Sequence, residues 1–392
     1  MTINGLHTAD NHLGFRQYGL QIREKDIMDS FARIVHMLVR DKDLHYMTVS
    51  GDLLNSKYPS VNTMTFLSKM HDVLRKAGKP CFVISGNHDG GYKSNNWIGI
   101  FNSGSLELEE GKMYQKIDVG GFIDIDGMSV EYKGVTIFGA PYMKREAWLQ
   151  LQEKHVKHDI LLMHQTFKEF FNFNSANSFS FEDINKDLFG CTIVGDIHIS
   201  KTVELEAQGK KAYLVSPGST ELLSKGEAAT KYVVVSSKED DHLKLSYTEI
   251  KTRDVITFDV GSIDQYKEIY KRIVDTYDEN NQPLVYLNIN IENVYSPNQL
   301  PDIGDLFQRT ILRMSYGKQL FVDNEEATQE ETDGNITVLD VGMQMFDRMI
   351  TTSMSEFKNE LSYILEEGLK DELNFRREVE GVLGKLKDAK VI

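Results

Sequence analysis

The sequence predicts an α/β protein in which sheets are stacked in layers and helices cover their outer faces. Two observations predict this class. Strand-like apolar runs alternate with helical periodicity over residues 2–85, and further strand-like runs cluster between residues 134 and 249. Strand–helix–strand units followed by clustered strands are typical of layered α/β folds. The composition is that of a globular protein, because 41% of the residues are hydrophobic and 26% are charged.

The first elements alternate between strand and helix. In order, we expect a strand at 2–7, a helix at 23–42, a strand at 45–50, a helix through 64–74 and a strand at 81–85. The first helix is predicted because Ile27, Phe31, Ile34 and Leu38 recur at intervals of three or four residues. Lys79-Pro80 ends the second helix, since proline has no N–H to donate. The later strand candidates are 134–139, 159–163, 191–195, 211–216, 230–236 and 243–249.

A second, smaller α/β unit is expected to begin near residue 252. Its predicted elements are a strand at 255–260, a helix at 262–278, a strand at 284–291 and a helix–strand pair within 298–322. Residues 323–335 then carry six acidic and no basic side chains, which indicates a solvated linker. We therefore expect a first domain at 1–252, a small domain at 253–322, an acidic linker at 323–339 and C-terminal helices at 340–392.

The predicted C-terminal helices have an apolar face that includes Phe357, Leu361 and Leu365. Methionines precede this face in the sequence, at positions 343, 345, 349 and 354. Two interpretations stay open. The helices either pack on their own domain or bind a partner, for which a methionine-rich apolar face is well suited.

The charge balance limits the class of function. The chain has 44 basic and 59 acidic residues, a net charge of −15. Phosphate contacts dominate the affinity of nucleic-acid binders, so this charge argues against a free-standing, non-specific DNA binder. It is compatible with a nuclease whose acidic residues hold metal ions, or one whose grip on DNA is shared with a partner.

Cysteine usage and hydropathy indicate the compartment. The two cysteines, Cys81 and Cys191, cannot build a disulfide framework, which favours a reduced, cytoplasmic location. We see neither a secretory signal nor a continuous apolar run of about 18 residues, so no membrane association is expected.

Five short clusters of metal-ligand residues follow strand-like runs. They are Asp10-Asn11-His12, Gly51-Asp52, Gly86-Asn87-His88-Asp89, His164 and Gly195-Asp196-Ile197-His198. Sites of open α/β sheets gather outside the carboxyl ends of strands, so separate clusters can meet in space. Each cluster alone fits a turn or a hydrogen-bonded core histidine. Their joint occurrence favours a functional site.

The residue types point to divalent metal ions. Asp, Asn and His give a mixed oxygen and nitrogen shell without thiolates, which suits Mn²⁺, Fe²⁺ or Zn²⁺ better than a structural zinc cage. Two ions in such a shell lie about 3.5–4 Å apart and can clamp a phosphate. A glycine precedes Asp52, Asn87 and Asp196, and we expect each glycine to let the chain turn sharply there.

At these motifs the sequence resembles a known family. The matching segments are LHTADNHLG (6–14), SGDLLNS (50–56), SGNHDGG (85–91), FGAPY (138–142), LLMHQ (161–165), VGDIHIS (194–200) and VSPGSTELLS (215–224). They resemble the calcineurin-like metallophosphoesterase superfamily and, within it, the SbcD-type nuclease subunits of the SbcCD double-strand-break repair complex. The resemblance implies a metallophosphoesterase-type two-sheet sandwich flanked by helices, with a small α/β capping domain and C-terminal helices.

The resemblance also implies roles for individual residues. One metal would be held by Asp10, His12 and His198, with Asp52 bridging to a second metal. Asn87, His164 and Asp196 would complete the second site. His88 would be the catalytic histidine at the leaving oxygen, with Asp89 orienting its ring.

One residue departs from the family pattern. The fifth motif usually reads Gly-His-x-His, whereas this chain has Asp196. A carboxylate adds negative charge and favours harder metals.

Substrate contacts are expected beside the third motif. Tyr92, Lys93 and Trp97 form a basic and aromatic mixture, and Lys57 follows the second motif. Trp97 equally fits a core or loop-anchoring role.

The implied activity is a two-metal, Mn²⁺-dependent DNA nuclease, exonucleolytic on duplex ends and endonucleolytic on single strands, acting in DNA repair, recombination and replication. No G-x-x-x-x-G-K-[ST] pattern occurs, so any ATP dependence must come from another chain. The resemblance implies that this other chain is an SbcC-like ABC ATPase, bound through the C-terminal helices, and that two nuclease subunits are present in a heterotetramer. Two alternatives stay open: a phosphatase or phosphodiesterase of the same superfamily, and a non-catalytic scaffold of the ATPase.

Overall fold

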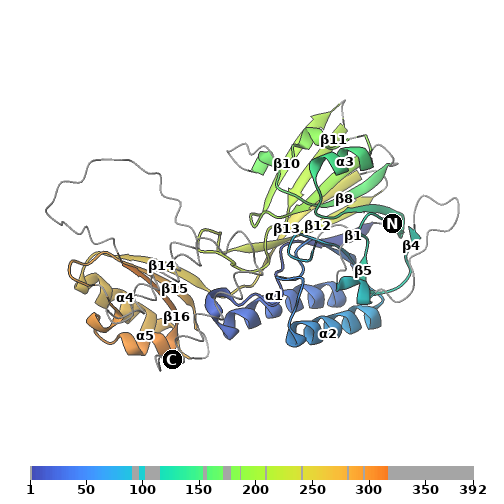
Figure 1. Cartoon of the computed structure of the whole chain (residues 1–392). Coiled ribbons are helices and arrows are strands. Elements are labelled where there is room, and N and C mark those ends of the chain that lie inside the picture. The colour runs from blue at the N-terminus through green and yellow to red at the C-terminus, as the bar shows by residue number, and fades with distance from the viewer. Residues whose placement is uncertain are drawn as a thin grey trace, which may run out of the picture. The chain divides into compact units, whose positions relative to one another are not determined.

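The computed structural model describes residues 2–316, except 91–96, 102–114, 153–156, 171–177, 186, 208–209, 240–241, 280–281 and 295. Two large sheets dominate the described residues (Figure 1). The first has the strand order β13 (His242–Ile250), β12 (Lys231–Glu239), β1 (Ile3–Thr8), β2 (Leu44–Ser50), β3 (Pro80–Ile84) and β5 (Gly121–Asp124). The second has the order β10 (Lys201–Ala207), β11 (Lys210–Ser216), β9 (Phe189–Gly195), β8 (His158–His164), β7 (Val135–Ala140), β6 (Ser129–Tyr132) and β4 (Gln115–Lys116).

The centre of each sheet is parallel. Strands β1, β2, β3 and β5 of the first sheet run parallel to one another, as do β7, β8, β9 and β11 of the second. The carboxyl ends of the parallel strands in a sheet therefore meet at one edge, which is where the metal-ligand motifs begin.

The inner faces of the two sheets share one apolar core. Side chains of both sheets pack together there, among them Tyr46, Phe82 and Ile84 from the first sheet and Ile137, Ile160, Leu162, Cys191 and Ile193 from the second. Such face-to-face packing defines a sandwich. The predicted two-sheet α/β fold is confirmed.

Helices α1 (Gln21–Arg40) and α2 (Val61–Ala77) cover the outer face of the first sheet (Figure 1). The predicted apolar face of α1 is buried, since Ile27, Phe31, Ile34 and Leu38 are all inaccessible to solvent. Ser60 caps α2 by accepting a hydrogen bond from the Thr63 N–H, and Gly78 ends it in the left-handed conformation at φ 64°.

The outer face of the second sheet is covered by α3 (Arg145–Gln152) and by aromatic side chains. Phe167, Phe170, Phe179 and Phe181 are buried there around Trp148. These phenylalanines therefore pack in the core. Short 3-10 helices complete the described segments: η1 (Gln17–Gly19), η2 (Ile98–Phe101), η3 (Lys168–Phe170), η4 (Phe181–Asp183) and η5 (Pro297–Gln299).

A separate three-stranded parallel sheet follows residue 253. Its strands are β14 (Val255–Val260), β15 (Leu284–Ile289) and β16 (Ile311–Tyr316), joined by α4 (Ile263–Thr276) and α5 (Ile303–Arg309). It has its own core, which includes Tyr266, Ile273 and Leu287. Arg253 precedes this unit and forms an ion pair of 2.6 Å with Asp26 of α1.

The predicted linker at 323–339 and the predicted helices at 340–392 lie outside the described residues. None of the helices in the described part of the chain has the length and apolar character needed to cross a bilayer.

A buried neutral histidine makes stability depend on pH. His7 of β1 is fully buried, and its two ring nitrogens lie 2.8 Å from the Thr48 hydroxyl and 2.7 Å from the Ser236 hydroxyl. Burial lowers the pKa of His7 from 6.5 to about 3. The unfolded chain therefore binds a proton at this residue between those pH values while the folded protein does not, so acid favours unfolding there.

We expect this histidine to reduce the free energy of unfolding by roughly 1 kcal/mol for each pH unit below its unfolded pKa, down to its folded pKa. The measurement is urea unfolding at several pH values for the wild type and for His7→Gln. The variant should be less stable at neutral pH, and the difference should shrink as the pH falls. A difference that is constant over pH 7 to 4 would contradict the prediction.

Candidate metal centre

Five segments deliver polar side chains to one place at the strand ends. Four follow the carboxyl ends of β1, β2, β3 and β9, and the fifth, His164, is the last residue of β8. Backbone hydrogen bonds join the first two of these loops, from the Asp10 N–H to the Gly51 carbonyl at 3.2 Å and from the His12 N–H to the Asp52 carbonyl at 2.9 Å. The side chains that meet there are Asp10, His12, Asp52, Asn87, His164, Asp196 and His198.

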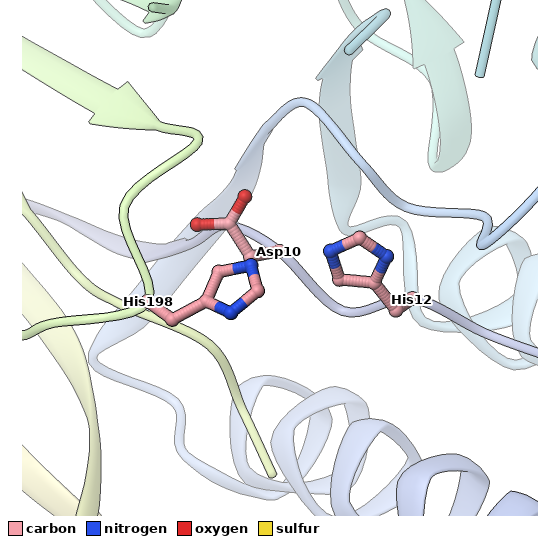
Figure 2. Close-up of side chains that lie close together, drawn as sticks. All are labelled: Asp10, His12 and His198. Carbon is pink, nitrogen blue, oxygen red and sulfur yellow. The ribbon is translucent and has the colours of Figure 1, made fainter. Parts of the chain in front are cut away.

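The first group consists of Asp10, His12 and His198 (Figure 2). One potential ligand atom from each lies within 4.8 Å of the others. Figure 2 shows one ring nitrogen of His198 directed toward Asp10 and the other pointing away. Asp10 and His12 are buried, and His198 is partly exposed. Three donors from two distant parts of the chain therefore face one small space.

The second group surrounds the ring of His164. Its Nε2 atom lies 3.0 Å from Asn87 Oδ1, 3.4 Å from Asp52 Oδ2 and 3.9 Å from Asp196 Oδ1. Asp52 lies between the two groups, because the same Oδ2 atom is 3.5 Å from His12 Nε2. A carboxylate in this position is suited to bridge two cations.

The backbone is strained where the ligands are placed. Asp10, His12, Asp52 and Asp196 have φ values of 50°, 46°, 50° and 81°, in the left-handed region that non-glycine residues rarely adopt. Such strain persists only where surrounding structure holds it, and it concentrates at functional sites. The strain here fixes the direction of four candidate ligands.

The glycines of the motifs allow close approach. Gly51 has a φ of 85°, and a Cβ atom there would lie 2.2 Å from His164 Nδ1. Gly86 has an ordinary φ, but its Cβ would lie 2.1 Å from Asp52 Oδ1. Gly195 likewise has no room, since its Cβ would lie 2.1 Å from the Ser50 carbonyl oxygen. The expected sharp turn therefore applies to Gly51, while Gly86 and Gly195 are needed because neighbouring groups touch them.

Hydrogen bonds fix which nitrogen of two histidines is available. His164 Nδ1 lies 2.9 Å from the Ser50 carbonyl oxygen, and His198 Nδ1 lies 2.8 Å from Glu227 Oε1. Both partners can only accept, so Nδ1 carries the proton in each ring. In the neutral ring, Nε2 is then the nitrogen whose lone pair can bind a metal ion, as is usual for ligand histidines with an outer partner.

The electrostatics of the site favour an added positive charge. Burial raises the pKa of Asp10 to about 6 and lowers the pKa of His12 to about 4. Burial would also lower the pKa of His164, but its hydrogen bond to Asp52 and the nearby carboxylates raise it to about 10. The protonated ring of His164 is thus the counter-charge for these carboxylates, and a bound cation would displace that proton.

Two buried polar atoms at the centre support the fit to a metal ion. Within the described residues, Asp10 Oδ2 and His12 Nε2 are buried and make no hydrogen bond. Leaving buried polar atoms unsatisfied is costly, so such atoms call for a bound ion or water. Carboxylate, amide and imidazole donors also match divalent ions such as Mn²⁺. The residues present therefore fit a divalent metal centre.

His88 lies on the exposed side of the same cluster. Its side chain forms a third group with His12 and Asp52, and its ring centroid is 4.8 Å from that of His12. The His88 N–H donates to Asp52 Oδ1 at 2.9 Å, and its ring Nδ1 donates to the Asn55 carbonyl at 3.0 Å. The ring is therefore held by Asn55, a residue to which the sequence assigned no role.

Asp89 connects two loops of the site. Its buried carboxylate accepts hydrogen bonds from the N–H groups of Leu54, Gly86 and Leu53, at 2.8, 2.9 and 3.3 Å. These contacts tie the loop after β3 to the loop after β2. The expectation that Asp89 also orients the His88 ring stays a prediction.

The expected substrate contacts are described only in part. Tyr92 and Lys93 lie outside the described residues. Lys57 is exposed, with its ammonium 5.2 Å from the ring centroid of Tyr58. The Trp97 indole N–H donates to the Lys57 carbonyl at 2.6 Å, so Trp97 anchors a loop.

Sequence reasoning missed Glu227, which binds the ring of His198. Its side chain is 7% exposed and lies between β11 and β12. Burial would raise the pKa of Glu227, but His198 and Lys231 lower it to about 2, so it is a carboxylate at neutral pH. No local pattern marks this residue, because it lies 29 positions beyond the histidine that it contacts.

The sandwich and its converging Asp, Asn and His side chains define a class: metal-dependent phosphoesterases, whose active site lies at the strand ends. A family model described as calcineurin-like phosphoesterase matches residues 5–200, half of the chain. The chain belongs to the calcineurin-like phosphoesterase family. The predictions of this family and of a phosphoesterase enzyme are confirmed.

Similar proteins carry a more specific name. The chain is 24% identical over 307 residues to "DNA double-strand break repair protein Mre11" of Sulfurisphaera tokodaii, covering 74% of each chain. It is 27% identical over 307 residues to the protein of that name from Methanocaldococcus jannaschii, covering 73% of this chain and 76% of the relative. A Methanosarcina acetivorans protein of the same name is 26% identical over 349 residues, 83% of this chain, but the chain spans about half (54%) of its length. The narrower resemblance to SbcD-type subunits stays a prediction.

Proposed function

We propose that this phosphoesterase is an SbcD-type DNA nuclease that hydrolyses phosphodiester bonds with two divalent metal ions, Mn²⁺ above all. It acts as an exonuclease on duplex ends and as an endonuclease on single strands, in DNA repair, recombination and replication inside the cell. The observation that carries the proposal is the convergence of seven Asp, Asn and His side chains from five strand ends. The names of the relatives, DNA double-strand break repair proteins, support DNA as the substrate.

The proposed ligands divide into two sites. Asp10, His12 and His198 hold one ion, which the first group of donors supports. Asn87, His164 and Asp196 hold the other, supported by their distances around His164 Nε2. Asp52 belongs to both sites, since its Oδ2 atom faces both His12 and His164.

The reaction needs a nucleophile, charge stabilisation and a proton for the leaving oxygen. Bound divalent cations supply the first two, by lowering the pKa of a water toward about 7 and by neutralising phosphate charge. His88 supplies the proton. With its Nδ1 donating to the Asn55 carbonyl, Nε2 is the nitrogen that exchanges a proton with the leaving oxygen. Exposure of the His88 side chain gives a DNA strand access to it.

Partners and domains follow the same proposal. Residues 1–252 are the nuclease domain and 253–322 the capping domain. Beyond the acidic linker at 323–339, residues 340–392 bind an SbcC-like ABC ATPase, and two nuclease subunits join two ATPase subunits. The net charge of −15 supports shared binding, because a chain this acidic needs a partner to hold DNA. Tyr92, Lys93 and Lys57 contact the substrate.

Asp196 is proposed to set the metal preference. Its carboxylate accepts a hydrogen bond from the Thr166 hydroxyl, and its N–H donates to Asp10 Oδ1 at 2.9 Å. A carboxylate ligand favours hard ions over those that prefer imidazole. We expect Asp196→His to raise the affinity for Zn²⁺ relative to Mn²⁺, measured by calorimetric titration of the metal-free protein. An unchanged or lower ratio would contradict the role of Asp196 as a ligand.

The function is tested with purified full-length protein and MnCl₂, without and with an SbcC-like ATPase. The substrates are linear duplex DNA, single-stranded circles and p-nitrophenyl phosphate, with chelator as the control. Cleavage of both DNA substrates that stops on chelation is the expected result. Hydrolysis of the small ester alone would indicate a phosphatase or phosphodiesterase. Binding of DNA or ATPase without hydrolysis in any divalent metal would indicate a scaffold.

A further inference from the structure

Glu227 connects His198 to a buried lysine. Glu227 Oε1 accepts from His198 Nδ1 at 2.8 Å and from the Ser224 hydroxyl at 3.1 Å. Glu227 Oε2 accepts from Lys231 Nζ at 2.6 Å, from the Ser219 hydroxyl at 3.0 Å and from the Leu223 N–H at 3.2 Å. The Lys231 side chain is only 2% exposed. Both oxygens of the carboxylate thus accept hydrogen bonds, and rotation of the carboxylate would break several of them.

The rings of His164 and His198 are held by different kinds of hydrogen-bond partner. The ring of His164 is held by a main-chain oxygen of Ser50, which no substitution removes. The ring of His198 is held by a side chain from a separate loop. Of these two rings, that of His198 is therefore the one whose Nδ1 hydrogen bond depends on a replaceable side chain.

We propose that Glu227 is a positioning residue that acts through His198, keeping the proton on Nδ1 so that Nε2 is free to bind a cation. The inference rests on the proposed metal centre. Lys231 holds the carboxylate in place and balances its charge, so that Glu227 orients the ring without adding a net negative charge beside Asp10. Outer partners of this kind raise the basicity of a ligand histidine and fix its tautomer.

Glu227→Gln tests the tautomer directly. Lys231 Nζ and the Leu223 N–H can only donate, so the amide oxygen of glutamine must face them. The amide NH₂ group then faces His198 and can only donate to Nδ1. The proton of the neutral ring is thereby moved to Nε2, the nitrogen that the cation needs. This nearly isosteric substitution therefore reverses the tautomer of the His198 ring.

The experiment combines Mn²⁺ titration calorimetry with ¹⁵N spectroscopy of the imidazole side chains, in the full chain. The expected result is that one of the two ions binds about 10- to 100-fold more weakly in Glu227→Gln, while the other is unchanged. In the metal-free variant, the ¹⁵N shifts of His198 should exchange between Nδ1 and Nε2, and those of His164 should stay.

Glu221→Gln is the matched control. Glu221 is a carboxylate of the same segment and is 1% exposed, but it pairs with Arg23 at 3.2 Å and Ser30 at 3.1 Å. The Glu221→Gln substitution should lower the melting temperature and leave the affinities for both Mn²⁺ ions unchanged. Two unchanged affinities in folded Glu227→Gln, or an equal loss of both ions in the two variants, would overturn the inference. Absence of Mn²⁺ binding in the wild type would overturn the metal centre itself.

Discussion

Asp52→Asn is expected to lose at least about 10³-fold in DNA cleavage, because a catalytic cation supplies several kcal/mol of charge stabilisation. Asp52 is the side chain that faces both groups, at 3.5 Å from His12 Nε2 and 3.4 Å from His164 Nε2. Its φ of 50° is one that asparagine also tolerates, so the loop should keep its conformation. The amide oxygen can still accept from the His88 N–H. The substitution therefore removes the negative charge of Asp52 and preserves the fold.

The measurements are single-turnover cleavage of linear duplex DNA, calorimetric Mn²⁺ stoichiometry and thermal melting. We expect weaker binding of both ions and a metal-free protein that still folds but melts at a lower temperature, because Asp52 no longer pairs with the buried ring of His164. The control is Asp159→Asn, which removes a carboxylate that is engaged by Lys238 and Thr136 instead. Cleavage within tenfold of the wild type, with two ions bound, would show that Asp52 is not a shared ligand.

His88→Gln is expected to slow cleavage by about 10²- to 10⁴-fold, the usual contribution of a positioned proton donor. The His88 side chain is exposed, and its ring contacts the Asn55 carbonyl rather than the core. Folding and Mn²⁺ stoichiometry should therefore stay as in the wild type. This separates His88 from the proposed ligands, whose loss weakens metal binding.

The check is the cleavage rate at saturating Mn²⁺ and DNA. Asp89→Asn is a useful comparison, because the buried carboxylate of Asp89 accepts hydrogen bonds from three backbone N–H groups. It should melt at a lower temperature, since an amide cannot accept all three bonds as well. If His88→Gln cleaved DNA at the wild-type rate, the proton would come from another group.

The elements that carry the site could be predicted from the sequence because each is an apolar run that ends in a polar motif. The run 159–163 ends at His164, and β8 spans His158–His164. Helix α1 was predicted because its buried residues recur with the period of a helix. Local patterns of this kind depend only on which face is buried.

The elements that the sequence did not predict lack such a pattern. Strand β10 (KTVELEA) lies at the edge of its sheet and carries alternating charged residues. Strand β5 is four residues long. The contact between Glu227 and His198, and the one between Asn55 and His88, depend on which loops meet in three dimensions. The spacing of residues along the chain therefore does not predict these contacts.

The order of the ligands along the chain has a consequence for biosynthesis. They run from Asp10 after the first strand to His198 after β9, with the supporting Glu227 later still. A nascent chain on the ribosome cannot assemble this cage until most of the sandwich has emerged. Under the proposed function, cation binding would therefore have to wait until this domain has folded, and an incomplete chain would lack the proposed catalytic site.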